Sequence, residues 1–226
     1  MFLKIGHRWA AGYEPENTLA SFQKAIDLNV DMIELDVYLC KTGELVVLHD
    51  PKVDRTTNGI GYIEDKTFEE LRKLDAGKGE KIPTLQEVLD LVDKRVQVNI
   101  ELKWADTATA VGDLIQEYIN TKERKTEHFV VSSFNHYELQ TFKKQHPQIR
   151  IGALLWEIPL GLAKFWVELD AWSVNLCNEF INQEFVDDGH QRWLKVLVWT
   201  TNDLDDIEKM KNLWIDWAFS NFPDRL

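Results

Sequence analysis

QVNIELK (residues 97–103) and FVVSSF (129–134) are two short apolar runs separated by a stretch of helix length, and this arrangement decides the fold. Both runs are rich in β-branched residues or alternate in polarity, which is typical of strands. The stretch between them carries apolar residues at helical spacing, namely Val111, Leu114, Ile115, Tyr118 and Ile119. A strand, a helix and a second strand in this order predict two parallel strands joined by a helical crossover.

The same unit recurs along the chain. Further strands are expected at residues 2–7, 31–37, 149–155, 170–175, 194–200 and 216–221, with helical patterns between them. The first of these helices follows PENT, where Asn17 is the expected N-cap. Eight strands alternating with helices predict an α/β fold, a (β/α)8 TIM barrel whose final helix is missing or vestigial. A doubly wound open sheet is the alternative, and it is weaker because no glycine-rich phosphate motif follows any strand.

One part of the chain breaks the alternation. LVVLHD (45–50) follows the strand at 31–37 after only a short turn, and so short a connection predicts an antiparallel hairpin. Residues 51–82 then form a small insertion after the second barrel strand. Thr67 with Glu70 and Thr84 with Glu87 have the spacing of capping boxes, so a helix is expected to begin at each pair.

Composition indicates one globular domain over residues 1–226. The chain is 44% hydrophobic, and no apolar run approaches the ~18 residues of a membrane-spanning helix. Lys4 interrupts the apolar start, so no signal peptide is expected. The two cysteines form neither a metal pattern nor a disulfide framework and are expected to be buried reduced thiols. These features predict a cytoplasmic protein without a stable membrane anchor.

The charge balance restricts the partners. A formal net charge of -12 argues against nucleic acid or an anionic membrane as the main partner. An anionic small-molecule ligand would need a local cluster of arginine, lysine or metal to overcome this field. The sequence does not indicate the oligomeric state.

Three carboxylates gather at the carboxyl ends of the predicted strands, where barrels carry their chemistry. Glu34 and Asp36 are two residues apart and so share one face, and Glu101 lies on the neighbouring predicted strand. Three carboxylates in one place repel one another unless cations lie among them. All-oxygen ligands favour Mg²⁺ or Ca²⁺. A salt-bridge network with Lys103 and Arg8 is the alternative, and the pattern alone leaves both open.

Two histidines lie at the carboxyl edges of apolar strands. His7 precedes Arg8, and His49 ends the hairpin. Imidazoles titrate near neutral pH, so this pair could act as general acid and general base, with Arg8 and Lys103 binding a phosphate-like group. The sequence does not decide which histidine is the acid. A structural role is expected for the other histidines, His128, His136, His146 and His190.

Several motifs, taken together, resemble the glycerophosphodiester phosphodiesterases. They are HRWAAGYEPENTLASF, DMIELDVYLCKTGELVVLHD, DRTTNG, LDAG, IPTLQEVL, NIELK, VSSF, VWTTND and SNFPD, in unbroken order from residue 5 to residue 224. The resemblance implies a distorted (β/α)8 barrel with an insertion. It also implies hydrolysis of glycerophosphodiesters, such as glycerophosphocholine or glycerophosphoethanolamine, to sn-glycerol 3-phosphate and an alcohol. In part of the family a substrate hydroxyl attacks first and a cyclic phosphate forms.

The resemblance also implies roles for individual residues. His7 and His49 match the acid/base pair, and Glu34, Asp36 and Glu101 match the ligands of a divalent metal. Arg8 and Lys103 match positions that contact the phosphate, while Phe134 and Trp199 resemble walls of the substrate pocket.

One position departs from the family pattern. The chain has Trp9 where the family usually has glycine after His-Arg, which leaves the range of substrates open. Trp104 and Trp156 follow predicted strands, and either could line an apolar mouth, although packing roles are expected for most of the tryptophans. Two other functions are considered: phospholipase D-like cleavage of lysophospholipids, and a non-catalytic barrel that binds polyol phosphates.

Overall fold

A computed structural model describes residues 3–103 and 106–226, apart from the side chain of Trp9. Within these ranges the chain forms a sheet of nine strands. They are β1 (Leu3–Gly6), β2 (Met32–Leu39), β3 (Leu45–Val47), β4 (Gln97–Leu102), β5 (Phe129–Ser133), β6 (Arg150–Leu155), β7 (Ser173–Cys177), β8 (Lys195–Trp199) and β9 (Trp217–Ser220).

Eight of these strands close into a parallel barrel. The order is β1-β9-β8-β7-β6-β5-β4-β2, and β1 also pairs with β2, which closes the sheet. The predicted (β/α)8 barrel is therefore confirmed. The open doubly wound sheet is wrong because β1 and β2, the two end strands of the parallel order, pair with each other. The predicted hairpin is also present, since β3 runs antiparallel to the end of β2, with Val37 opposite Val47.

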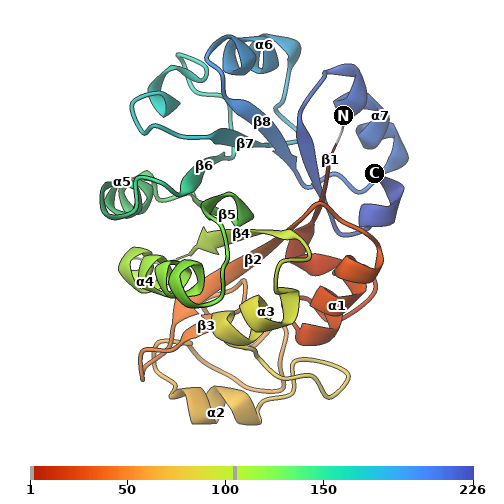
Figure 1. Ribbon diagram of the computed structural model, residues 1–226. Helices are drawn as coiled ribbons and strands as arrows, with labels where there is room; N and C mark the ends of the chain where they lie inside the picture. Colours follow the sequence, from red (N-terminus) through yellow and green to blue (C-terminus); the bar gives the residue numbers. More distant parts are fainter. Residues whose placement is uncertain (1–2, 104–105) are drawn as a thin grey trace.

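Helices cover the outside of the barrel (Figure 1). They are α1 (Leu19–Asp27), α3 (Leu85–Val92), α4 (Thr107–Thr121), α5 (His136–Gln145), α6 (Gln183–Gln191) and α7 (Leu204–Asn212). Their apolar faces and the outward side chains of the strands form the main hydrophobic core. Two strands are followed by a 3-10 turn instead of a helix. After β6 the turn is Lys164–Trp166, in which Trp166 is fully buried, and after β9, the last strand, it is Pro223–Arg225.

The helix starts show which capping predictions hold. The boxes at Thr67 and Thr84 are formed and begin α2 (Phe68–Lys73) and α3, as predicted. The prediction for α1 is wrong by one residue, because Thr18 caps the helix and its side chain accepts from the backbone N–H of Ser21. Asn17 instead has a left-handed backbone (φ 57°), and its side chain donates to Asp36 Oδ2 at 3.0 Å.

Residues 51–82 pack beside the hairpin and include α2, at the opposite edge of the molecule from α6 (Figure 1). Their apolar side chains join those of the hairpin in a separate buried cluster that includes Val46, Val53, Ile63 and Leu71. Cys40 belongs to this cluster, and both it and Cys177 are free and buried, as predicted. In the part of the chain that the structure describes, no helix has the length and apolar character needed to cross a membrane.

Candidate active site

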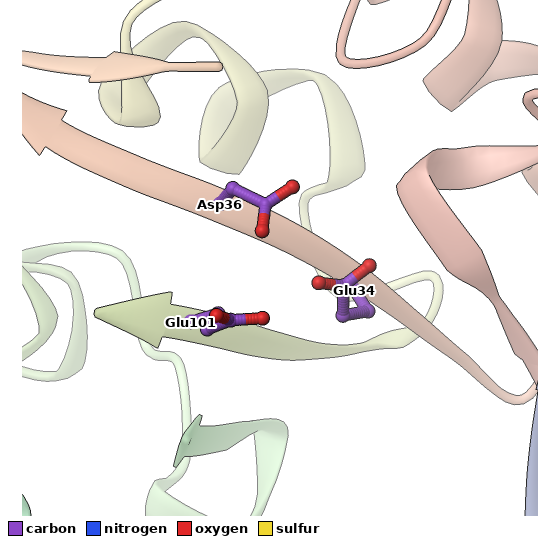
Figure 2. Close-up of side chains that lie close together, drawn as sticks. All are labelled: Glu34, Asp36 and Glu101. Atoms are coloured by element: carbon purple, nitrogen blue, oxygen red, sulfur yellow. The ribbon is translucent and has the colours of Figure 1, made fainter. Parts of the chain in front are cut away.

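Neighbouring strands bring the three carboxylates together. Glu34 and Asp36 lie on β2 and Glu101 lies on β4, where the parallel register places Asp36 directly opposite Glu101. Because side chains alternate along a strand, the three point to the same side of the sheet (Figure 2). One oxygen from each lies within 4.8 Å of the others. All are buried, with exposed fractions of 3%, 0% and 8% for Glu34, Asp36 and Glu101.

Burial and mutual repulsion perturb these carboxyl groups. Burial, followed by the charges of Asp36 and Glu101, raises the pKa of Glu34 well above its usual range. Burial and Asp36 raise the pKa of Glu101 to about 7. Burial would also raise the pKa of Asp36, but Lys103, His49 and Arg8 outweigh it and the pKa is lowered. The positive charges of Arg8 and Lys103 therefore do not balance the negative charges of all three carboxylates.

The cluster fits a divalent cation. Oδ1 of Asp36 is 3.3 Å from Nζ of Lys103 but accepts no hydrogen bond from the described residues. Asn99, the register partner of Glu34, is buried and both its amide atoms lack a described hydrogen-bond partner. Carboxylate and amide oxygens are the ligands that hard divalent cations take in proteins. Part of the alternative salt-bridge network is also formed, since Lys103 Nζ lies 2.7 Å from Glu101 Oε1.

His7 and Arg8 follow β1 in a short 3-10 turn. Gly6 pairs with Ser220 of β9, which brings His7 beside Asn221, and Nδ1 of His7 donates to Oδ1 of Asn221 at 2.7 Å. The neutral ring then carries its free lone pair on Nε2. Burial and the adjacent Arg8 lower the pKa of His7 to about 4. Arg8 has a left-handed backbone (φ 42°), and its backbone N–H donates to Glu34 Oε2 at 2.9 Å.

His49 has a charged partner where His7 has a neutral one. Its Nδ1 lies 2.6 Å from Oδ1 of Asp50. Burial lowers the pKa of His49, while Asp36 and Asp50 act in the opposite direction. Hydrogen bonds from Arg55 and His49 lower the pKa of Asp50 to about 2, so this carboxylate is ionised at neutral pH.

A chain of ion pairs connects the two histidine-bearing segments. Arg55, from the insertion, donates through Nε to Asp50 Oδ2 at 2.6 Å and through a terminal nitrogen to Glu16 Oε1 at 2.7 Å. The same Glu16 oxygen lies 3.4 Å from a terminal nitrogen of Arg8. Sequence reasoning did not single out Glu16 and Arg55 or a partner for His49. The signal that could have found them is their place in the motifs: Glu16 in PENT, Asp50 in HD and Arg55 in DRTTNG.

The site contains a cavity of about 270 Å³ at the carboxyl ends of the strands. The lining includes eight of the nine predicted site residues, namely His7, Arg8, Glu34, His49, Glu101, Lys103, Phe134 and Trp199. Asp36, the ninth, is fully buried. Asn99 and Ser132 add polar groups, and Leu154, Trp156 and Phe219 extend the apolar wall. Trp156 thus lines the cavity, whereas Trp104 and the side chain of Trp9 lie outside the described residues.

Comparison with known proteins identifies the class. The model of the glycerophosphoryl diester phosphodiesterase family matches residues 7–225. The chain is 40% identical to a glycerophosphodiester phosphodiesterase of Caldanaerobacter subterraneus subsp. tengcongensis, over 99% of this chain and 96% of the relative. It is 30% identical to a glycerophosphodiester phosphodiesterase of Bacillus subtilis, over 98% of this chain and 84% of the relative.

A solved structure gives the same result. A phosphodiesterase from Oleispira antarctica, in complex with the product sn-glycerol 3-phosphate, superposes with a TM-score of 0.91 and 31% identity, covering 98% of this chain and 93% of that one. The chain therefore belongs to the glycerophosphoryl diester phosphodiesterase family and is an enzyme of that class. The predicted family and enzyme class are confirmed, which sets aside the non-catalytic barrel. The roles of individual residues stay predictions.

Proposed function

We propose that this enzyme hydrolyses glycerophosphodiesters, such as glycerophosphocholine and glycerophosphoethanolamine, to sn-glycerol 3-phosphate and an alcohol with the help of Mg²⁺ or Ca²⁺. The observation that carries this proposal is one cavity in which three buried carboxylates lie beside two histidines. The product bound to the Oleispira relative is that of the same reaction and supports the substrate class.

Glu34, Asp36 and Glu101 would hold the cation. When bound there, a divalent cation supplies positive charge that stabilises the negative charge of a phosphodiester and its transition state. Arg8 and Lys103 bind the phosphate oxygens and offset the charge that grows as the phosphorus is attacked. Their positions support this role, since both side chains line the cavity and are only 21% and 13% exposed.

The partners of the two rings distinguish their roles. His7 is the general base, because its low pKa keeps it neutral and its Nδ1–H is held by Asn221, which leaves Nε2 to accept a proton. His49 is the general acid, because the Asp50 carboxylate at Nδ1 opposes the lowering of its pKa by burial, whereas His7 has only a neutral partner at Nδ1. His7 removes a proton from the attacking water or glycerol hydroxyl, and His49 donates one to the alcohol oxygen as its bond to phosphorus breaks. Where the hydroxyl attacks, a cyclic phosphate forms, and water then opens it to sn-glycerol 3-phosphate.

The remaining predictions are part of the same proposal. Phe134 and Trp199 form a wall of the substrate pocket, and residues 1–226 act as one domain with an insertion at 51–82. The partner is a small molecule rather than nucleic acid, in line with a formal net charge of -12. Location in the cytoplasm stays a prediction.

The decisive experiment measures release of sn-glycerol 3-phosphate from glycerophosphocholine and glycerophosphoethanolamine. The purified protein is treated with EDTA, dialysed, and assayed with and without added Mg²⁺ or Ca²⁺. We expect turnover only after a cation is restored, and greatly reduced turnover in Glu101→Gln under every condition. Full activity after exhaustive removal of metal, or no activity with either cation on a folded protein, would contradict the proposal.

One observation favours a second candidate, cleavage of lysophospholipids. The segments that follow β6, β7 and β8 carry exposed apolar side chains: Leu160 and Phe180 in loops and Leu204 at the start of α7, with exposed fractions of 104%, 40% and 68%. These segments surround the end of the barrel that holds the cavity, where an acyl chain would contact them. Release of choline from lysophosphatidylcholine tests this candidate. The double variant Leu160→Ser with Leu204→Ser should reduce that release without changing the rate of glycerophosphocholine hydrolysis.

A further inference from the structure

Trp156 forms an aromatic corner with two predicted wall residues. It follows β6, lines the cavity and is 54% exposed. Its ring centroid lies 5.1 Å from that of Trp199 at an interplanar angle of 62°, and Phe134 meets the same Trp199 ring at 5.5 Å and 88°. The indole N–H of Trp199 donates to the backbone oxygen of Asn175 at 3.1 Å, which holds the central ring in place.

The corner lies on other strands than the carboxylates and farther out. Its residues follow or end β5, β6 and β8, whereas the carboxylates lie on β2 and β4. Phe134 and Trp156 are 45% and 54% exposed, and the carboxylates are almost completely buried. With the phosphate held between Arg8, Lys103 and the histidines, one half of a diester extends towards this outer corner. If the leaving alcohol is the half that extends towards this exposed corner, it can depart directly into solvent.

The chemistry of the corner discriminates between amino alcohols. Phe134, Trp156 and Trp199, together with Leu154 and Phe219 beside them, offer ring faces and aliphatic surface but no side-chain hydrogen-bond acceptor. A primary ammonium group donates three hydrogen bonds, so desolvation against these rings leaves its donors unsatisfied. A trimethylammonium group donates none and is attracted to aromatic faces.

We propose that the corner of Phe134, Trp156 and Trp199 selects diesters whose leaving alcohol carries a quaternary ammonium group, and that Trp156 determines this specificity. The inference rests on the proposed function and deepens it. The formal net charge of -12 also favours the approach of a cationic end group over a neutral one.

Three esters of sn-glycerol 3-phosphate test the inference: those of choline, ethanolamine and 3,3-dimethylbutan-1-ol, the uncharged isostere of choline. The kcat/KM of each is measured with saturating metal for the parent, Trp156→Ala and Trp156→Phe. Trp214→Ala, which removes a 79% exposed indole from the loop before β9 at the other end of the barrel, is the matched control.

We expect the parent to prefer the choline ester over both others. Trp156→Ala should lower its kcat/KM for the choline ester by about 3- to 30-fold and change that for the ethanolamine ester by less than about two-fold. Trp156→Phe should retain much of the preference because it keeps a ring face, and Trp214→Ala should retain all of it.

Other results would overturn the inference. An equal loss for all three esters in Trp156→Ala would mean that the indole only shapes the cavity, and equal kcat/KM for the choline ester and its neutral isostere would exclude recognition of the cation. A higher kcat/KM of the parent enzyme for the ethanolamine ester than for the choline ester would also refute the inference. If the parent cleaves none of the esters with metal present, the proposed function itself fails, which is a different result from cleavage without preference.

Discussion

At the scale of the residue, the partner of each imidazole nitrogen sets the difference between the two histidines. Asn221 holds His7 through a neutral amide oxygen, and Asp50 holds His49 through a carboxylate. A carboxylate stabilises an imidazolium ion, whereas an amide oxygen does so far less. Burial lowers the pKa of both rings, but a carboxylate partner opposes this effect only at His49, which distinguishes the acid from the base.

The acid and base roles can be separated with two leaving groups. Each of His7→Ala and His49→Ala should lower kcat for glycerophosphocholine by about 10²- to 10⁴-fold. With p-nitrophenol as the leaving group, which departs without a proton, His49→Ala should recover most of its rate and His7→Ala should not. His128→Ala, from the turn before β5 at the opposite end of the barrel, is the control. Recovery in His7→Ala instead would reverse the two roles.

Asp50 should control the pH profile through His49. The hydrogen bond to Asp50 raises the pKa of His49, so Asp50→Asn should lower the pKa of His49. If His49 must be protonated to act as the acid, activity is lost as the pH rises through this pKa, and the alkaline limb of kcat should move to lower pH. Profiles of kcat against pH for the parent and Asp50→Asn check this. An unchanged alkaline limb with a lower kcat would indicate a structural role for Asp50.

Some residue-level features followed from the sequence, and others did not. The period of two along a strand was sufficient to predict that Glu34 and Asp36 share a face. Asn17 was misassigned as a helix cap because capping is a local preference, whereas its side chain is engaged by Asp36, which is 19 residues away in sequence. The contact between Arg55 and Glu16 spans 39 residues, and no local pattern predicts it.

At the scale of the element, Asp216 connects the ends of three elements. It lies just before β9, and its Oδ1 accepts from Lys195 Nζ at 2.7 Å. Its Oδ2 accepts from the backbone N–H of Val196 on β8 and contacts Nε2 of His190 on α6, both at 2.9 Å. Burial alone would raise the pKa of Asp216, but these partners outweigh it and the pKa is lowered.

The stability contribution of Asp216 should depend on pH. A carboxyl group whose pKa is lower in the folded state stabilises the fold above its unfolded pKa, near 4, and the contribution is lost as the pH falls through the folded value. Asp216→Asn should therefore reduce the free energy of unfolding by about 1–3 kcal/mol at pH 7 and by much less at pH 2.5. Urea unfolding at several pH values measures this, with the exposed Asp113→Asn as control. A difference that does not change with pH would contradict the prediction.

Strands and helices alternate along the barrel as predicted, but some bounds differ, and the connection between β6 and β7 contains a 3-10 turn where a helical pattern was expected. A strand was expected at 170–175, whereas β7 runs over Ser173–Cys177. Asp170 has a left-handed backbone (φ 49°) and belongs to a turn, and Leu176 and Cys177 pair with Leu155 and Trp199 on the flanking strands. Pairing across the sheet therefore decided where this strand begins and ends.

At the scale of the whole molecule, we expect the carboxylate cluster to couple cation binding to folding. Its members come from β2 and β4, which are adjacent only in the folded sheet, so the unfolded chain offers no such site. A ligand that binds only the folded state stabilises it by about 2.7 kcal/mol at 100 times its dissociation constant. Added Mg²⁺ or Ca²⁺ should therefore raise the Tm of the EDTA-treated protein.

Thermal unfolding with and without cation measures this effect, independently of catalysis. Glu101→Gln should abolish the cation-dependent rise in Tm, whereas Glu127→Gln, an exposed carboxylate in the turn before β5, should preserve it. A rise of the same size in both variants would place the stabilising cation elsewhere.

The sequence by itself determined the alternating elements, the barrel, the hairpin and the set of polar residues at the strand ends. It could do so because hydrophobic periodicity and turn chemistry are local properties, and because ordered motifs identify a family. Only the tertiary structure decided which polar groups pair: Asn221 with His7, Arg55 with Glu16, and Trp156 with Trp199. These contacts join segments far apart in the sequence, and each depends on how strand ends and loops pack in three dimensions, which no local pattern encodes.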